Sequence, residues 1–185
     1  AGWFFGGPCA GAGCTIVSGA IAERATFLAY CLYSIVLTGF VYPPVVHMMW
    51  TSGKFSAWRT APRLFGDCGV IDFAGSGTVH MTGGVAALVA CFFMGTRKGF
   101  PDNLPEGQPV YQALGIFILW MGWYGFNCVS TLYIDGYAQS AAHAGAEAGR
   151  QGRDPVRGQR RLIGRVVLEH FEAVAVVAVE AVLGA

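Results

Sequence analysis

The sequence predicts an all-α, polytopic membrane protein. Of its 185 residues, 54% are hydrophobic and 12% are charged, whereas an ordinary soluble domain has about 25% charged residues. The charges lie in short clusters, and long apolar runs separate these clusters. A helix of about 20 apolar residues crosses a hydrocarbon core of about 30 Å, and a buried helix of a soluble protein rarely needs more than about 14 residues. The uncharged runs therefore predict membrane helices.

The first predicted span covers residues 1–22 and ends at Glu23-Arg24. It is not typical of a signal peptide, because it has no initiator Met and no basic region before it, and it stays apolar to its end. The missing Met leads us to expect a fragment or a processed chain. A second span is predicted at about residues 26–50. The pair Pro43-Pro44 removes two backbone donors there and should kink the helix.

Two further spans are predicted at about residues 72–94 and 110–134. They follow a long loop at 51–71 and a polar turn at 95–109. The third span is rich in Gly, Ala and Ser, a composition that lets membrane helices approach closely. The fourth span is dense in aromatic residues. Residues 1–136 are thus predicted to form the membrane core.

Residues 137–185 are predicted to be a divergent tail, rich in Arg, Gly and Ala. Within it, Glu169, Glu172 and Glu180 recur at helical spacing, so we expect an amphipathic helix at 166–183 that is too charged to be a span. The Arg residues of the tail also conflict with the positive-inside rule. The loops expected on one side of the membrane hold three basic residues, and the 51–71 loop on the other side also holds three. The tail follows the fourth span, so its Arg residues would lie on the side of the 51–71 loop.

Composition argues against several function classes. The net charge of +1 leaves no basic surplus to hold a phosphate backbone, so no nucleic-acid partner is expected. The six cysteines contain no C-x-x-C pair, and most fall in apolar runs. They are interpreted as small buried side chains, neither a disulfide framework nor a zinc site, and we expect no metal and no cofactor. The six are Cys9, Cys14, Cys31, Cys68, Cys91 and Cys128.

The strongest candidate site opens the third span, where Asp72 lies eight residues, about 12 Å along a helix, before His80. A charge at mid-span costs about 2.5–3.5 kcal/mol, so such groups usually face a cavity, a partner or a pathway. Two structural roles stay open. Asp72 is well placed to cap a helix N-terminus, and His80 to be a neutral imidazole bonded to a backbone carbonyl. An enzyme is not predicted, since neither G-x-S-x-G nor H-E-x-x-H occurs.

A second candidate is the aromatic stretch 120–127, which reads Trp-Met-Gly-Trp-Tyr-Gly-Phe-Asn. Gly122 and Gly125 leave the helix surface without side chains beside these bulky rings. The stretch fits either a packed interface with a membrane-surface belt, or a pore with aromatic gates. Trp50, at the end of the second span, fits either a belt tryptophan or the wall of a cation site.

Together these motifs resemble the ammonium transporter family (Amt/Mep/Rh), and they look most similar to its plant and algal members. The resemblance implies eleven membrane helices per subunit in a homotrimer, of which this chain covers about the third to sixth. It also implies a multi-pass protein of the plasma membrane, surrounded by lipid, that transports ammonium or ammonia. Four motifs, in the family's order, carry the resemblance: Thr15 to Arg24, Tyr42 to Trp50, Asp72 to His80 and Gly122 to Asn127.

The resemblance also implies an outer site and an orientation. Trp50 and Ser130 would recruit ammonium, and Asp72 would be the acid beside them. The loops at Glu23-Arg24 and 95–109 would be cytoplasmic, and the loop at 51–71 extracytoplasmic. Ammonium would then lose its proton at the outer site and cross a hydrophobic pore as ammonia.

The pore residues that the resemblance implies are Phe126, Trp123 and His80. Phe126 would be one of two stacked gate rings, Trp123 a pore-lining tryptophan and His80 the first of two pore histidines. Cys9 stands where the other gate ring is expected, so the outer gate would be incomplete. The second histidine belongs to a later helix, and the hydrophobic helix expected after Tyr137 is not recognisable. The alternative prediction is therefore a truncated, mis-spliced or frame-shifted fragment that does not transport and at most associates with full-length subunits.

Overall fold

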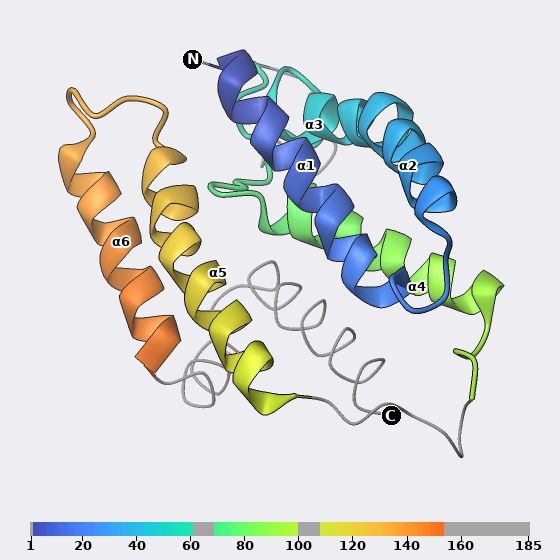
Figure 1. Cartoon of the computed structure of the whole chain (residues 1–185). Helices are drawn as coiled ribbons and strands as arrows, with labels where there is room; N and C mark the ends of the chain where they lie inside the picture. The colour runs from blue at the N-terminus through green and yellow to red at the C-terminus, as the bar shows by residue number, and fades with distance from the viewer. Residues whose placement is uncertain (1, 61–68, 100–107, 154–185) are drawn as a thin grey trace. The chain divides into compact units, whose positions relative to one another are not determined.

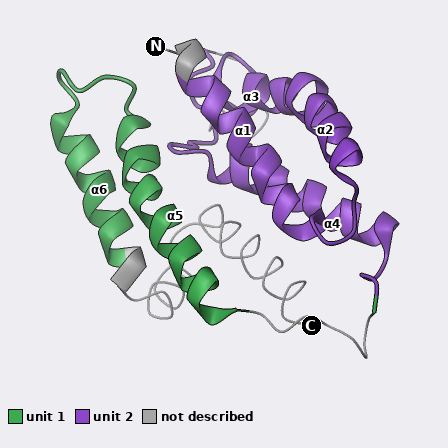
Figure 2. Cartoon of the chain, viewed as in Figure 1, with its two compact units in different colours: residues 1, 99–166 green, residues 2–98, 167–185 purple. Residues whose placement is uncertain are grey.

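The computed structural model describes residues 2–60, 69–99 and 108–153, and the amphipathic helix predicted at 166–183 lies outside them. The described residues are helical, as the sequence predicts (Figure 1). They contain no strand, and their only sheet-like pairing is an isolated parallel bridge between Ser56 and Val70. The described chain divides into two compact units (Figure 2), one formed by Gly2–Lys98 and the other by residues 99–153.

The first unit begins with α1 (Gly2–Ile21), which covers the first predicted span. Next comes a continuous helix from Phe27 to Trp50 in three parts, α2 (Phe27–Val36), the π-helical η1 (Leu37–Val41) and α3 (Tyr42–Trp50). The Thr26 hydroxyl caps its start by accepting a hydrogen bond from the Ala29 backbone N–H at 3.3 Å. Pro43 and Pro44 lack an N–H, and the turn before them takes the π form. The kink expected at the proline pair stays a prediction.

The last helix of this unit joins η2 (Ser76–Met81), again π-helical, to α4 (Thr82–Met94). It starts four residues later than the predicted span at 72–94. Asp72 caps the start from outside the helix, and Gly75 takes a left-handed conformation with φ of 94°. A Cβ at residue 75 would lie 2.6 Å from Val79 Cγ2, so this position requires glycine.

The core of the first unit lies around α1, which packs along α4 (Figure 1) and also contacts η1. α1 and α4 approach each other closely at Gly83. A Cβ there would come within 2.8 Å of the Gly13 carbonyl oxygen. The predicted role of small residues in this span is therefore confirmed at Gly83. The buried core side chains are Cys14, Val17, Ala20, Ile21, Leu37 and Ala87.

The described cysteines differ in their burial. Cys9 and Cys14 are buried, as predicted, whereas Cys31, Cys91 and Cys128 are only half-buried. Cys14 also has a polar role, because its thiol donates to the Ser34 hydroxyl at 3.0 Å and so links α1 to α2.

The second unit is a helical hairpin of α5 (Pro109–Val129) and α6 (Ala138–Arg153). α5 ends five residues before the predicted end at 134. α6 occupies the start of the predicted tail, and its small residues lie against the large side chains of α5. The Trp120 indole donates to the Ala148 carbonyl at 3.2 Å, and a Cβ at Gly149 would come within 2.9 Å of the Tyr124 hydroxyl oxygen.

Two described helices, Phe27–Trp50 and Ser76–Met94, are long and apolar enough to cross a membrane. The apolar part of α1, Phe5–Ile21, is shorter. Helices thus lie at all four predicted stretches, and the assignment of all four as membrane spans stays a prediction.

Candidate functional site

The Asp72 carboxylate organises the turn that opens η2. Its Oδ1 accepts from the Gly75 N–H at 2.8 Å and from the Ser76 hydroxyl at 3.4 Å. Its Oδ2 accepts from the N–H and the hydroxyl of Thr78, each at 2.7 Å. Asp72 is only 3% exposed. The capping role left open by the sequence is therefore the one that the structure shows.

His80 is buried one turn further along the same helix. Its Nδ1 lies 3.2 Å from the Gly75 carbonyl oxygen, which also accepts from the backbone N–H groups of Val79 and His80. A carbonyl oxygen only accepts, so Nδ1 carries the proton in this contact and the lone pair of a neutral ring lies on Nε2. The bond to a backbone carbonyl is thus present, and it fixes the orientation of the ring.

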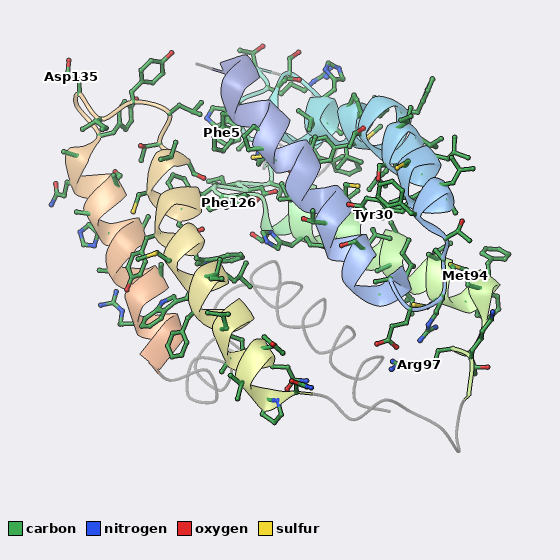
Figure 3. The ribbon with its side chains drawn as sticks, viewed as in Figure 1. Phe5, Tyr30, Met94, Arg97, Phe126 and Asp135 are labelled. Carbon is green, nitrogen blue, oxygen red and sulfur yellow. The ribbon has the colours of Figure 1, made fainter. Side chains whose placement is uncertain are left out.

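Trp50 joins the end of α3 to this turn. Its indole N–H donates to the Asp72 carbonyl oxygen at 2.6 Å. Phe5 of α1, labelled in Figure 3, lies against the same indole, with ring centroids 5.9 Å apart and planes at 48°. Two aromatic rings and the backbone carbonyl of the buried Asp72 thus lie together at one end of the first unit. The faces of such rings attract a cation through their quadrupoles.

Phe5 is a candidate site residue that the sequence analysis does not identify. The sequence analysis places the other gate ring near Cys9, which is 1% exposed. Phe5 lies four residues before Cys9 and therefore on the same face of α1. That spacing was the available signal, although the contact with Trp50 depends on how α1 and α3 pack.

The other predicted site residues lie in the second unit, on α5. Trp123 and Phe126 stack on each other, with centroids 5.8 Å apart and planes at 15°. Ser130 is the C-cap of α5, and its hydroxyl donates to the Phe126 carbonyl oxygen at 2.8 Å. The structure therefore groups Trp50, Asp72 and His80 in one unit. It groups Trp123, Phe126 and Ser130 in the other.

In the part of the chain that the structure describes, no group of three His, Cys, Asp or Glu side chains is arranged to hold a metal ion.

Comparison with known proteins decides the family. The sequence model of the Ammonium Transporter Family matches residues 1–150 of the 185. The chain belongs to the ammonium transporter family. The match continues past Tyr137 into α6, so it includes the first part of the predicted tail.

Three relatives show the range of similarity. Ammonium transporter 1 member 1 of Oryza sativa subsp. japonica is 51% identical over 133 residues, which are 68% of this chain and 26% of the relative. Ammonium transporter 1 member 2 of Arabidopsis thaliana is 46% identical over 153 residues, 77% of this chain and 29% of the relative. Ammonium transporter Amt2 of Archaeoglobus fulgidus is 43% identical over 136 residues, which are 70% of this chain and 29% of the relative.

The chain spans less than a third of the length of these curated ammonium transporters. No solved structure matches it at a significant level. Family membership is therefore a statement about this segment, and the activity of the whole protein is a proposal.

Proposed function

We propose that this chain forms part of a transporter that moves ammonium across a membrane by deprotonating it and passing ammonia through a hydrophobic pore. The observation that carries the proposal is the meeting of Trp50, Asp72 and His80 in one small region of a membrane-type helical unit. An aromatic wall, a buried carboxylate and a lone-pair-bearing imidazole are the groups that such a path needs.

The energetics favour ammonia over ammonium as the species that crosses. Bringing an ion into a low-dielectric pore costs several to tens of kcal/mol before compensation. With the lysine ammonium pKa of about 10.4 as a stand-in, deprotonation at pH 7 costs about 4.6 kcal/mol. A transporter therefore gains by leaving the proton at the outer site.

Each candidate residue has a role in this proposal. Trp50 and Ser130 recruit the cation, and the field of Asp72 favours it there. Trp123 and Phe126, stacked on α5, line the pore and its gate. His80 Nε2 accepts hydrogen bonds from ammonia inside the pore or relays the separated proton.

We further propose the assembly that the family membership suggests. The full-length protein has eleven membrane helices, forms a homotrimer and lies in the plasma membrane among its lipids. In that arrangement the Glu23-Arg24 and 95–109 loops are cytoplasmic, and Trp50 faces the other side.

A chimera tests the proposal without requiring the rest of this protein. Residues 1–150 replace the matching segment of the rice relative, and the product is expressed in cells that lack ammonium uptake. We expect growth on limiting ammonium. His80→Ala should abolish uptake or slow it strongly while the amount of protein in the membrane stays the same. His143→Ala, which changes an exposed histidine of α6, is the matched control and should leave uptake unchanged.

The alternative is a chain that assembles with full-length subunits and does not transport. Co-expression with the intact rice relative separates the two cases. A chimera that fails to support growth, together with reduced uptake by the co-expressed intact transporter, would favour the alternative. Unchanged uptake in the His80→Ala chimera would contradict the relay role of His80.

A further inference from the structure

Small residues form the face of α6 that meets α5 (Figure 1). The Trp120 indole donates to the Ala148 carbonyl oxygen at 3.2 Å, and a Cβ at Gly145 would lie 3.0 Å from Cys128 Sγ. This part of α6 therefore lies against residues 120–128 of α5. Those residues occupy the middle of the span predicted at about residues 110–134. The second half of α6 thus lies alongside this span and not beyond its end.

The opposite face of α6 carries polar and charged side chains. His143, Glu147 and Arg150 each lie about 140–160° around the helix from Gly145, since successive residues are about 100° apart. All three are exposed. Arg150 Nε donates to Glu147 Oε2 at 3.2 Å, and Arg150 Nη2 donates to Glu147 Oε1. The two members of this ion pair remain about equally open, with side chains 61% exposed at Glu147 and 59% at Arg150.

The ion pair uses only part of the hydrogen-bonding capacity of its members. A guanidinium has five N–H donors, and the two bonds to Glu147 engage two of them. An acyl chain offers neither an acceptor to Arg150 nor a donor to Glu147, so hydrocarbon against this face would strongly destabilise it. Ionisable groups at the depth of a membrane therefore face water, a pathway or a polar partner.

We propose that the polar face of α6 borders a water-filled cleft within the membrane, and that the Glu147–Arg150 pair keeps this cleft hydrated. Gln139 and Ser140 extend the same face with uncharged polar groups, and both are exposed. Water fits such a mixed face because each molecule both donates and accepts hydrogen bonds, whereas a protein partner would need a matching pattern of charges. The inference rests on the proposed function only in that α5 spans a membrane.

The cleft is distinct from the proposed pore. Tyr124 lies on the side of α5 that meets α6, because a Cβ at Gly149 would come within 2.9 Å of its hydroxyl oxygen. Trp123 and Phe126 lie about 100° and about 160° around α5 from Tyr124. The hairpin therefore has a hydrophobic pore face on α5 and a hydrated face on α6. Small water-soluble molecules reach the middle of the hairpin without entering the pore.

Thiol reactivity in the full 185-residue chain, reconstituted in phosphatidylcholine vesicles, tests the proposal. Ala146→Cys puts a thiol at an exposed position beside Glu147 and leaves every charge in place. Met121→Cys is the matched control, because Met121 is 80% exposed on α5 and lies within the stretch that meets α6. A water-soluble methanethiosulfonate reagent is present on both sides of the membrane, and the parent chain gives the background from its own cysteines. We expect residue 146 to react at least about tenfold faster than residue 121, because only the thiolate reacts and hydrocarbon disfavours its formation.

Two double variants connect the hydration to the ion pair. In the Ala146→Cys chain, Glu147→Leu with Arg150→Leu makes the face apolar and should lower the rate at residue 146 toward that at residue 121. Glu147→Gln with Arg150→Gln keeps the face polar and should retain most of the rate. An unchanged rate in the double leucine variant would overturn the role of the ion pair.

The remaining outcomes separate this proposal from the proposed function. Equally slow reaction at residues 146 and 121 would mean that protein or lipid covers the polar face, and the cleft would be rejected. Growth of the uptake chimera would then still support transport. Equally fast reaction at the two residues would place the hairpin outside the hydrocarbon, which would overturn the cleft and also contradict a span at α5.

Discussion

At the scale of the residue, the Asp72 carboxylate uses its hydrogen-bonding capacity within its own turn. A carboxylate has about four lone-pair sites, and here four donors from Gly75, Ser76 and Thr78 point at its two oxygens. A cation at Trp50, where we propose that ammonium is recruited, would therefore feel the charge of Asp72 through space. It would do so next to a carbonyl whose position the indole N–H fixes.

Asp72→Asn should destabilise the chain by about 2–3 kcal/mol. Asparagine has an NH2 group in place of one carboxylate oxygen, and an NH2 group cannot accept a hydrogen bond. At least one of the buried donors of Gly75 and Thr78 therefore loses its acceptor. The measurement is the thermal midpoint in detergent, and Asp135→Asn, in an exposed loop, is the control. If Asp72→Asn keeps its midpoint while the chimera loses uptake, Asp72 acts chiefly on the substrate.

Trp50→Leu in the chimera should raise the half-saturation concentration for ammonium more than it lowers the maximal rate. The substitution removes the ring face that is proposed to attract the cation, and with it the tilted ring contact with Phe5. Uptake kinetics measure both parameters, and Trp58→Leu, an exposed tryptophan of the following loop, is the control. A fall in maximal rate with unchanged half-saturation would make Trp50 structural.

The sequence could predict the chemistry of this turn better than its geometry. Asp72 as a cap and His80 on a carbonyl were both foreseeable from position and type. The bonds from Thr78 to a carboxylate six residues earlier were not, because they need a π-helical turn and a left-handed Gly75. Phe5 was missed because its partner is distant in the chain.

At the scale of the element, hydropathy located the helices, and local backbone chemistry set their ends. The helix predicted at 72–94 begins only at Ser76, because Asp72 caps its start from the preceding turn. The helix from Phe27 to Trp50 stays continuous although it contains two prolines, because the turn before them is the π-helical η1. α6 was not predicted, because its sequence is rich in Gly, Ala and Arg, and its apolar face consists of small side chains that give a low mean hydropathy. Its small residues become informative only beside the large side chains of α5.

Gly83→Ala should destabilise the first unit by about 1–3 kcal/mol. The new Cβ would lie 2.8 Å from the Gly13 carbonyl oxygen and 2.9 Å from Ile16 Cβ, so the backbones of α1 and α4 must separate. Gly19→Ala, on α1 with no neighbour within 4 Å, is the control. It should be neutral or stabilising by up to about 1 kcal/mol, because alanine is the better helix former. Equal thermal midpoints for the two variants would contradict the close crossing.

At the scale of the whole molecule, the first unit has two chemically different ends. Phe5, Trp50 and Asp72 meet at one end, and Glu23 pairs with Arg97 at the other. The 20 residues of α1 separate these ends by about 30 Å, which is the thickness of a hydrocarbon core. Counting basic residues in the loops gave a tie and could not orient the chain. The contacts of Arg24 with Gly95 and of Glu23 with Arg97 show that the segments after α1 and after α4 lie at the same end of the unit. Composition alone does not give that information.

The two ends should therefore be accessible from opposite sides of a membrane. Lys54→Cys and Lys98→Cys are made separately in the chimera, with Cys68 replaced by Ser. Both lysines are exposed, so each substitution changes little else. A membrane-impermeant maleimide should label residue 54 in intact cells, and it should label residue 98 only after permeabilisation, because the proposed orientation puts the Glu23–Arg97 end in the cytoplasm. The chimera that carries only Cys68→Ser gives the background from the other cysteines. Labelling of both positions from one side would mean that α1 does not span the membrane, and labelling of residue 98 alone in intact cells would reverse the orientation and place Trp50 on the cytoplasmic side.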